Sequence, residues 1–149
     1  MLKVYFDTCV WCRPFDEPDE FIAKEVEAIE MILDLHDHGE IKLISSNLVI
    51  SETSLISNER KRKAVIKLIK SLSDEIVKVD DLSLDLAEKI KEVCKLTIVD
   101  ALHVALASRF ADVFITVDKG ILKKVNCLQK YIMVLDPVDF NEHYRRGIR

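Results

Sequence analysis

Two acidic residues at predicted strand ends are the positions where residue type and spacing first point to chemistry. Asp7 follows the apolar run 2–6. Asp118 follows the apolar run 113–117. Both runs are short and rich in β-forming residues, so each is predicted to be a buried strand. In a parallel sheet, ligands bind at the edge formed by the carboxyl ends of the strands. Asp7 and Asp118 are therefore expected at one edge.

Two further acidic residues are predicted to reach the same edge. Glu52 lies early in a helix that leaves the strand 41–44, and Asp100 lies in the first turn of a later helix. Carboxylates close together raise one another's pKa values, whereas Mg²⁺ or Mn²⁺ neutralises them through oxygen ligands. Such ions generate a hydroxide nucleophile from water and stabilise charge on a phosphodiester. The four acids predict a metal-dependent nuclease site, in which Thr8 and Thr116 orient the ligands or a metal-bound water.

The elements that must position these acids follow from hydrophobic periodicity and from helix start and stop signals. Strands are predicted at 2–6, 41–44, 76–79, 113–117 and 132–135. Helices are predicted at 21–38, from 45–47 onward, at 58–72, 83–95, from 99 through 107, and at 120–128, with Ser83 as a cap and Gly39 as a terminating glycine. Strands separated by helices imply an α/β fold with a parallel sheet, because parallel neighbours need crossover connections.

Length and composition narrow the class of protein. A chain of 149 residues fits a single domain spanning residues 1–149. Its net charge of -4 gives no overall attraction to nucleic acid, so RNA binding would need local basic residues or bound cations. The sequence shows no signal-peptide apolar region and no run of membrane-spanning length, so we expect a cytoplasmic protein that does not associate with a membrane. Its four cysteines lack framework spacing, and no structural disulfide is expected.

Four segments together resemble the successive signatures of the PIN-domain family. They are 6–8, 51–52, 99–105 and 115–119, and they span almost the whole chain. The resemblance implies a three-layer α/β/α sandwich around a parallel sheet and cleavage of RNA with Mg²⁺ or Mn²⁺. It implies Asp7, Asp100 and Asp118 as the central catalytic and metal-binding acids, with Glu52 as the fourth.

The resemblance also implies partners. Many bacterial and archaeal members of this size are VapC-like toxins that are held in check by a small antitoxin and commonly form homodimers. The sequence departs from the family pattern at Cys9, where a small polar residue is common. It departs again after Asp118, where Lys119 and Gly120 offer no further acid, so the number of metal ions stays open.

Two other functions remain open from the residues alone. Cys9 and Cys12 form a CxxC after the first strand, which would suit a thiol-disulfide exchange protein. A basic stretch would let a non-catalytic module bind RNA or protein, and such a stretch is also an ordinary solvated helix face. This stretch contains Arg60, Lys61, Arg62 and Lys63. His103, three residues after Asp100, either lines the site or packs in the core.

Overall fold

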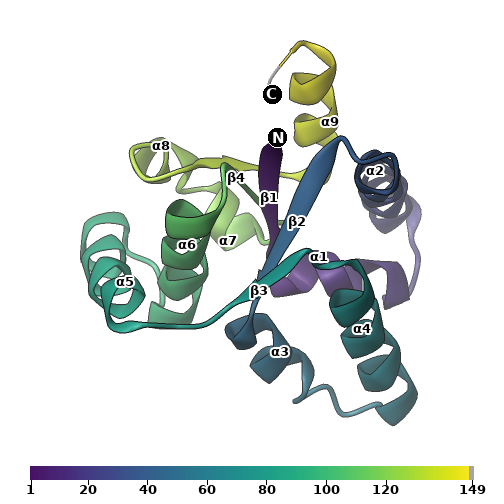
Figure 1. Ribbon diagram of the computed structural model, residues 1–149, viewed down its shortest axis with the longest axis horizontal. Helices are drawn as coiled ribbons and strands as arrows, with labels where there is room; N and C mark the ends of the chain where they lie inside the picture. Colours follow the sequence, from purple (N-terminus) through teal and green to yellow (C-terminus); the bar gives the residue numbers. More distant parts are fainter. Residues whose placement is uncertain (148–149) are drawn as a thin grey trace.

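A five-stranded parallel sheet forms the centre of the computed structural model, which describes residues 1–147 (Figure 1). The strand order is β3-β2-β1-β4-β5, and each neighbouring pair is parallel. The strands are β1 (Leu2–Phe6), β2 (Ile41–Ser46), β3 (Glu75–Val77), β4 (Val113–Ile115) and β5 (Met133–Leu135). The predicted α/β class is confirmed.

Helices cover both faces of this sheet, as expected for a parallel sheet. In Figure 1, α5, α6 and α8 lie on one side, and α2, α4 and α9 lie on the other. The helical elements are α1 (Thr8–Cys12), the 3₁₀ turn η1 (Arg13–Phe15), α2 (Glu20–Asp37), α3 (Asn47–Thr53), α4 (Glu59–Leu72), α5 (Asp81–Cys94), α6 (Ile98–Phe110), α7 (Lys119–Leu122), α8 (Val125–Leu128) and α9 (Pro137–Arg145).

The core is densest where α6 packs on the middle strands. Residues 101–107 of α6 are all buried, and this helix contacts α5, β1, β2 and β4. Tyr5 and Phe6 of β1 and Phe114 of β4 are fully buried beneath the helices. A helix segment that is buried all round is expected to be apolar or small on every face, and in this segment only His103 departs from that pattern.

The order of the strands fixes where a ligand site can form. The chain moves from β1 outward to β2 and β3, and then returns to the other side of β1 to form β4 and β5. The direction of winding therefore reverses between β1 and β4. At such a point the connections leave the strand ends in opposite directions and open a crevice at the carboxyl edge.

Several helix boundaries differ from the sequence prediction. The predicted Ser83 cap is wrong: Asp80 caps α5 by accepting a hydrogen bond from the Ser83 N–H at 2.9 Å. The predicted helix over 120–128 is two short helices, α7 and α8. Asp136 and Pro137 follow β5 and begin α9. Neither α9 nor α1 was predicted from the sequence. Gly39, with φ of +73°, ends α2 as predicted.

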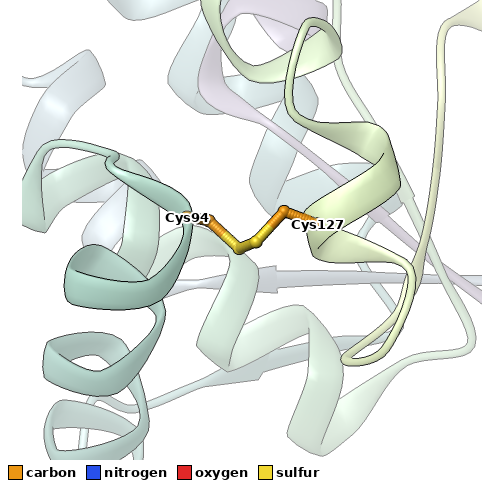
Figure 2. The surroundings of a disulfide bond; sticks show 2 residues. All are labelled: Cys94 and Cys127. Atoms are coloured by element: carbon orange, nitrogen blue, oxygen red, sulfur yellow. A yellow bond between two sulfur atoms is a disulfide. The ribbon is translucent and has the colours of Figure 1, made fainter.

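A disulfide joins Cys94 at the end of α5 to Cys127 in α8 (Figure 2). The expectation of no structural disulfide is therefore wrong. The two cysteines are 33 residues apart in sequence, and only the packing of α5 against α8 brings them together. Over residues 1–147, no helix is long and apolar enough to cross a membrane.

Candidate active site

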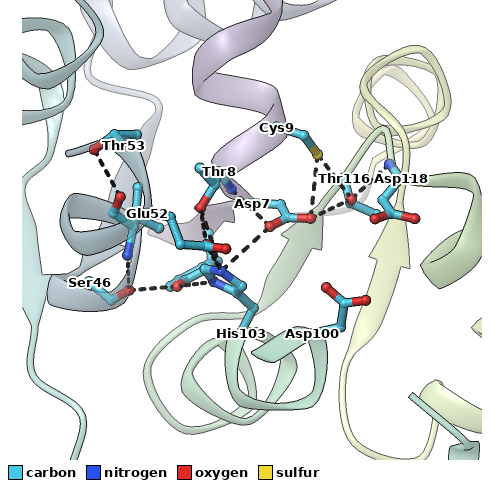
Figure 3. Close-up of polar contacts among 12 residues, drawn as sticks. Asp7, Thr8, Cys9, Ser46, Glu52, Thr53, Asp100, His103, Thr116 and Asp118 are labelled. Carbon is cyan, nitrogen blue, oxygen red and sulfur yellow. Dashed lines mark hydrogen bonds and ion pairs between the residues drawn. The ribbon is translucent and has the colours of Figure 1, made fainter. Parts of the chain in front are cut away.

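Asp7 directly follows β1, and Asp118 lies two residues farther along the chain than the first residue after β4, so both stand at the reversal point (Figure 3). Asp7 caps α1 by accepting from the Thr8 N–H at 2.8 Å, and Asp118 caps α7 by accepting from the Gly120 N–H at 2.7 Å. Each aspartate follows a buried strand and precedes a helix, where its carboxylate satisfies free N–H groups. The predicted placement of both residues at one edge is observed.

Thr116 connects these two aspartates. Its Oγ1 accepts a hydrogen bond from the Asp118 N–H at 3.0 Å and donates one to Asp7 Oδ2 at 2.7 Å. Because the backbone N–H can only donate, the threonine hydroxyl hydrogen is left to point at the Asp7 carboxylate. Thr116 is fully buried, and Cys9 Sγ lies 3.5 Å from the same oxygen as a third partner.

Glu52 reaches the same edge from α3. Ser46 caps this helix by accepting from the Val49 N–H, which places Glu52 in the second turn. Thr8 Oγ1 donates to Glu52 Oε1 at 2.6 Å, while the Thr8 N–H binds Asp7. One residue therefore fixes the spacing between two of the predicted acids.

His103 is the residue for which the sequence left open a place in the site or in the core. It is 1% exposed, and its Nε2 lies in hydrogen-bond contact with Glu52 Oε1 and 3.8 Å from Asp7 Oδ1. Its Nδ1 lies 2.9 Å from the hydroxyl of Tyr5. Its spacing from Asp100 on one helix was the only signal in the sequence, because the partners of the imidazole come from β1 and α3.

Asp100 stands opposite the other acids, in the first turn of α6 (Figure 3). Thr97 caps this turn by accepting from the Asp100 N–H at 3.2 Å. Burial raises the pKa of Asp100, and the negative charges of Asp118 and Asp7 raise it further. Asp100 therefore lies close enough to Asp118 and Asp7 for their charges to disfavour its ionised form.

Hydrogen bonding moves the pKa of Glu52 in the opposite direction. Burial raises this pKa, but hydrogen bonds from His103 and Thr8 lower it more, so that the net shift is downward. Burial also lowers the pKa of His103, whereas Glu52 and Asp7 raise it to a net upward shift. The downward shift of the Glu52 pKa favours its carboxylate form, whereas the upward shift of the Asp100 pKa disfavours the charged form of Asp100.

Comparison with known protein families matches residues 4–126 to the PIN domain. The chain belongs to the PIN-domain family. No curated protein matches the chain significantly.

Solved structures share the PIN-like fold. FitAcB from Neisseria gonorrhoeae aligns with a TM-score of 0.59 at 18% identity, covering 90% of this chain and 97% of that one. VapBC2 from Rickettsia felis, bound to a DNA fragment from their promoter, aligns with a TM-score of 0.60 at 12% identity, covering 91% and 98%. At these identities the likeness shows the fold alone.

The donor set of this PIN domain suits a hard divalent cation. Asp7, Asp100 and Asp118 would supply oxygen ligands, and the charges of Asp118 and Asp7 raise the pKa of Asp100, which His103 lowers only in part. Within residues 1–147, no three His, Cys, Asp or Glu side chains already stand close enough to hold a metal. The chemistry of the donors fits Mg²⁺ or Mn²⁺, and the carboxylates would have to draw together around it.

The predicted basic residues of α4 are largely engaged with the PIN domain itself. Lys61 Nζ pairs with Asp16 at 2.9 Å, and Arg62 donates to the Ile56 carbonyl at 2.8 Å. Lys63 pairs with Glu59 on the same helix. Arg60 is exposed. For three of the four candidate RNA-binding residues, these contacts favour an ordinary solvated helix face.

The CxxC pair lies beside the acids rather than in a redox geometry. Cys9 and Cys12 are free thiols in α1, and Cys9 Sγ donates to Asp7 Oδ2 at 3.4 Å. Burial raises the pKa of Cys9, and the charge of Asp7 raises it further. Because the thiolate is the reactive form, this environment disfavours thiol-disulfide exchange.

Proposed function

We propose that this protein is a divalent-metal-dependent endoribonuclease that hydrolyses RNA phosphodiester bonds. The observation that carries the proposal is the placement of Asp7, Asp100 and Asp118 around the reversal point of a PIN-domain sheet, near enough for the charges of Asp118 and Asp7 to raise the pKa of Asp100. Glu52 joins them through Thr8. Capping explains part of the role of Asp7 and Asp118, and the negative charge that raises the pKa of Asp100 suits a bound divalent cation that acts on phosphate.

Mg²⁺ or Mn²⁺ would be held by the four carboxylates and would supply the Lewis acidity that activates water and stabilises charge on phosphate. The residues of the chain contribute orientation. The hydroxyl of Thr116 holds one oxygen of Asp7, and the Thr8 N–H holds the other. Carboxylates that are already oriented lose less freedom when a ligand binds.

The substrate in this proposal is a polyanion, although the chain carries a net charge of -4. Approach of RNA therefore depends on the cation and on local positive charge. Lys119 directly follows Asp118 and lies 5.3 Å from the ring of Phe21, which is 58% exposed. An exposed ring beside a cation suits the stacking of an unpaired base, so single-stranded RNA is the favoured substrate form.

Cleavage of a mixed-sequence fluorescent RNA with Mn²⁺ tests this function. We expect wild-type protein to cut, EDTA to abolish cutting, and Asp100→Asn to lower the rate at least about a hundredfold, because transition-state charge stabilisation by the cation is worth several kcal/mol. Asp81→Asn is the matched control, since it removes the same charge from an exposed first turn of α5. We expect it to cut like wild type.

The other outcomes separate the alternatives. RNA binding without cleavage would overturn the nuclease and favour a non-catalytic module. Equal cleavage by wild type and Asp100→Asn would reveal a contaminating nuclease. Activity that ignores EDTA but disappears in Cys9→Ser would favour the thiol-disulfide reading.

The biological role in this proposal is that of a cytoplasmic homodimeric toxin restrained by a small antitoxin. Its support is the family resemblance and the similarity of the fold to FitAcB and VapBC2. Expression of wild-type protein should arrest growth, Asp100→Asn should not, and an antitoxin encoded beside the gene should restore growth. Normal growth with active wild-type enzyme would instead indicate an RNA-processing enzyme.

A further inference from the structure

A buried row of polar groups stands behind Glu52 (Figure 3). The Val49 N–H donates to Ser46 Oγ at 3.3 Å, and Ser46 Oγ lies 2.7 Å from the Tyr5 hydroxyl. The Tyr5 hydroxyl lies 2.9 Å from His103 Nδ1, and His103 Nε2 contacts Glu52 Oε1. The row runs from α3 through Ser46 at the end of β2 to β1 and α6, and it returns to α3 at Glu52, so it connects four elements of the fold.

Hydrogen-bond chemistry fixes the end of this row that faces the site. An ionised carboxylate can only accept, so His103 Nε2–H donates to Glu52 whether the ring is neutral or protonated. Tyr5 stays protonated because burial raises its pKa. For a neutral ring, the hydroxyl hydrogen of Ser46 points to Tyr5 and that of Tyr5 points to Nδ1. In a protonated ring the order reverses, and Tyr5 still binds Nδ1.

The row leaves one oxygen of Glu52 available. Both Thr8 Oγ1 and His103 Nε2 bind Oε1. Among residues 1–147, Oε2 has no hydrogen-bond partner. Two donors on a single oxygen hold the carboxylate plane and direct the second oxygen elsewhere. This is the arrangement expected of a carboxylate that is oriented in advance for an external ligand.

Burying polar groups such as these costs free energy unless each one is hydrogen-bonded. Tyr5 and Ser46 are fully buried and His103 is 1% exposed. Apolar residues of similar volume would fill this part of the core without polar groups that need partners. The row ends at His103 Nε2, whose hydrogen-bond contact among the candidate acids is Glu52, with Asp7 Oδ1 farther away at 3.8 Å.

We propose that His103 is a positioning residue that aims Glu52 into the acidic site, and that Tyr5 and Ser46 hold its imidazole for this task. The proposal rests on the proposed function, because it takes Glu52 as a ligand of the divalent cation. It adds residues outside the four acids, and it makes metal affinity depend on a hydroxyl group in the core of β1.

Calorimetric titration of the intact protein with Mn²⁺ alone tests this role without using catalysis. Substitutions behind a metal ligand typically weaken affinity by about 10-fold to 100-fold. We expect His103→Leu to fall in that range, and Tyr5→Phe to weaken Mn²⁺ binding by several-fold. His103→Gln, which keeps a donor, should recover part of the affinity. Tyr131→Phe removes a phenolic hydroxyl from a half-buried residue outside the row and should bind Mn²⁺ like wild type.

Urea unfolding of each variant separates positioning from folding. Wild-type Mn²⁺ affinity in folded His103→Leu and Tyr5→Phe would overturn the proposal and leave the nuclease intact. If His103→Leu fails to fold, Tyr5→Phe alone decides, because it removes a single oxygen. A wild-type protein that binds no Mn²⁺ and cuts no RNA would overturn the nuclease and this proposal together.

Discussion

At the scale of single residues, hydroxyl groups hold the acids in place. Thr8 binds Asp7 through its N–H and Glu52 through Oγ1, and Thr116 binds Asp7 while accepting from the Asp118 N–H. Short hydroxyls suit this work because each can accept and donate at once. Thr8 is the first residue of α1 and Thr116 directly follows β4, so the backbone of these elements places both hydroxyl groups.

Thr116→Val tests the importance of that hydroxyl. The substitution keeps the shape and strand preference of the side chain but leaves Asp7 Oδ2 without its 2.7 Å donor. We expect Mn²⁺ affinity to fall about tenfold and stability to fall by about 1–2 kcal/mol. Titration calorimetry and urea unfolding measure the two effects, and Thr116→Ser should restore both. Unchanged affinity in the valine variant would show that Asp7 needs no such support.

At the scale of elements, helix starts and strand ends coincide at the site. Asp7 directly follows β1 and Asp118 follows β4 after two further residues, and each caps the next helix, so one carboxylate both satisfies the backbone and lies at the carboxyl edge. The position of Asp100 depends on the placement of α6, which packs against α5. Arg109 of α6 donates to both carboxylate oxygens of Asp80 and to Ser83 Oγ, which fastens the two helices.

The Arg109–Asp80 pair predicts a loss of stability in acid. Hydrogen bonds from Arg109 lower the pKa of Asp80 from 3.8 to about 2. A carboxyl group whose pKa is lower in the folded than in the unfolded protein stabilises the fold at pH values above its unfolded pKa. For Asp80 this contribution disappears as the pH falls from 3.8 to about 2. Urea unfolding across that interval should show a steeper loss for wild type than for Arg109→Gln. Molar salt should reduce the difference, since the pair is exposed. Parallel curves would contradict the prediction.

At the scale of the whole molecule, the winding of the sheet and one disulfide define the frame. The reversal between β1 and β4 opens the crevice, and Cys94–Cys127 ties α5 to α8 on one side of the sheet. Disulfides are rare in the cytosol of mesophiles and common inside hyperthermophiles. The predicted cytoplasmic location therefore agrees with this bond in a hyperthermophile and is unusual for a mesophile.

Reduction of the disulfide should destabilise the protein. Closing a loop of 33 residues restricts the unfolded chain and contributes about 3–4 kcal/mol in the chain-entropy account. We expect a reductant to lower the urea midpoint of wild type by a corresponding amount. The double variant Cys94→Ala, Cys127→Ala should start from a lower midpoint and ignore the reductant. A wild-type midpoint that does not respond, with both thiols shown free by mass spectrometry, would refute this.

The sequence by itself determined the class of the fold and the identity of the candidate acids. Buried strands and amphipathic helices are written in local periodicity, and an acid directly after a strand has little freedom in where it can lie. Asp7 and Asp118 were therefore predictable at one edge, and the order of motifs indicated the family that residues 4–126 match.

The tertiary structure alone decided which distant side chains touch. His103 lies 51 residues from Glu52 and 98 from Tyr5, and Cys94 lies 33 from Cys127. Local preference carries no information about such pairs, because strand order and helix packing bring them together. The row behind Glu52, the disulfide and the gathering of Asp100 with Asp118 all depend on that long-range packing, since each requires elements that meet only in the folded sheet.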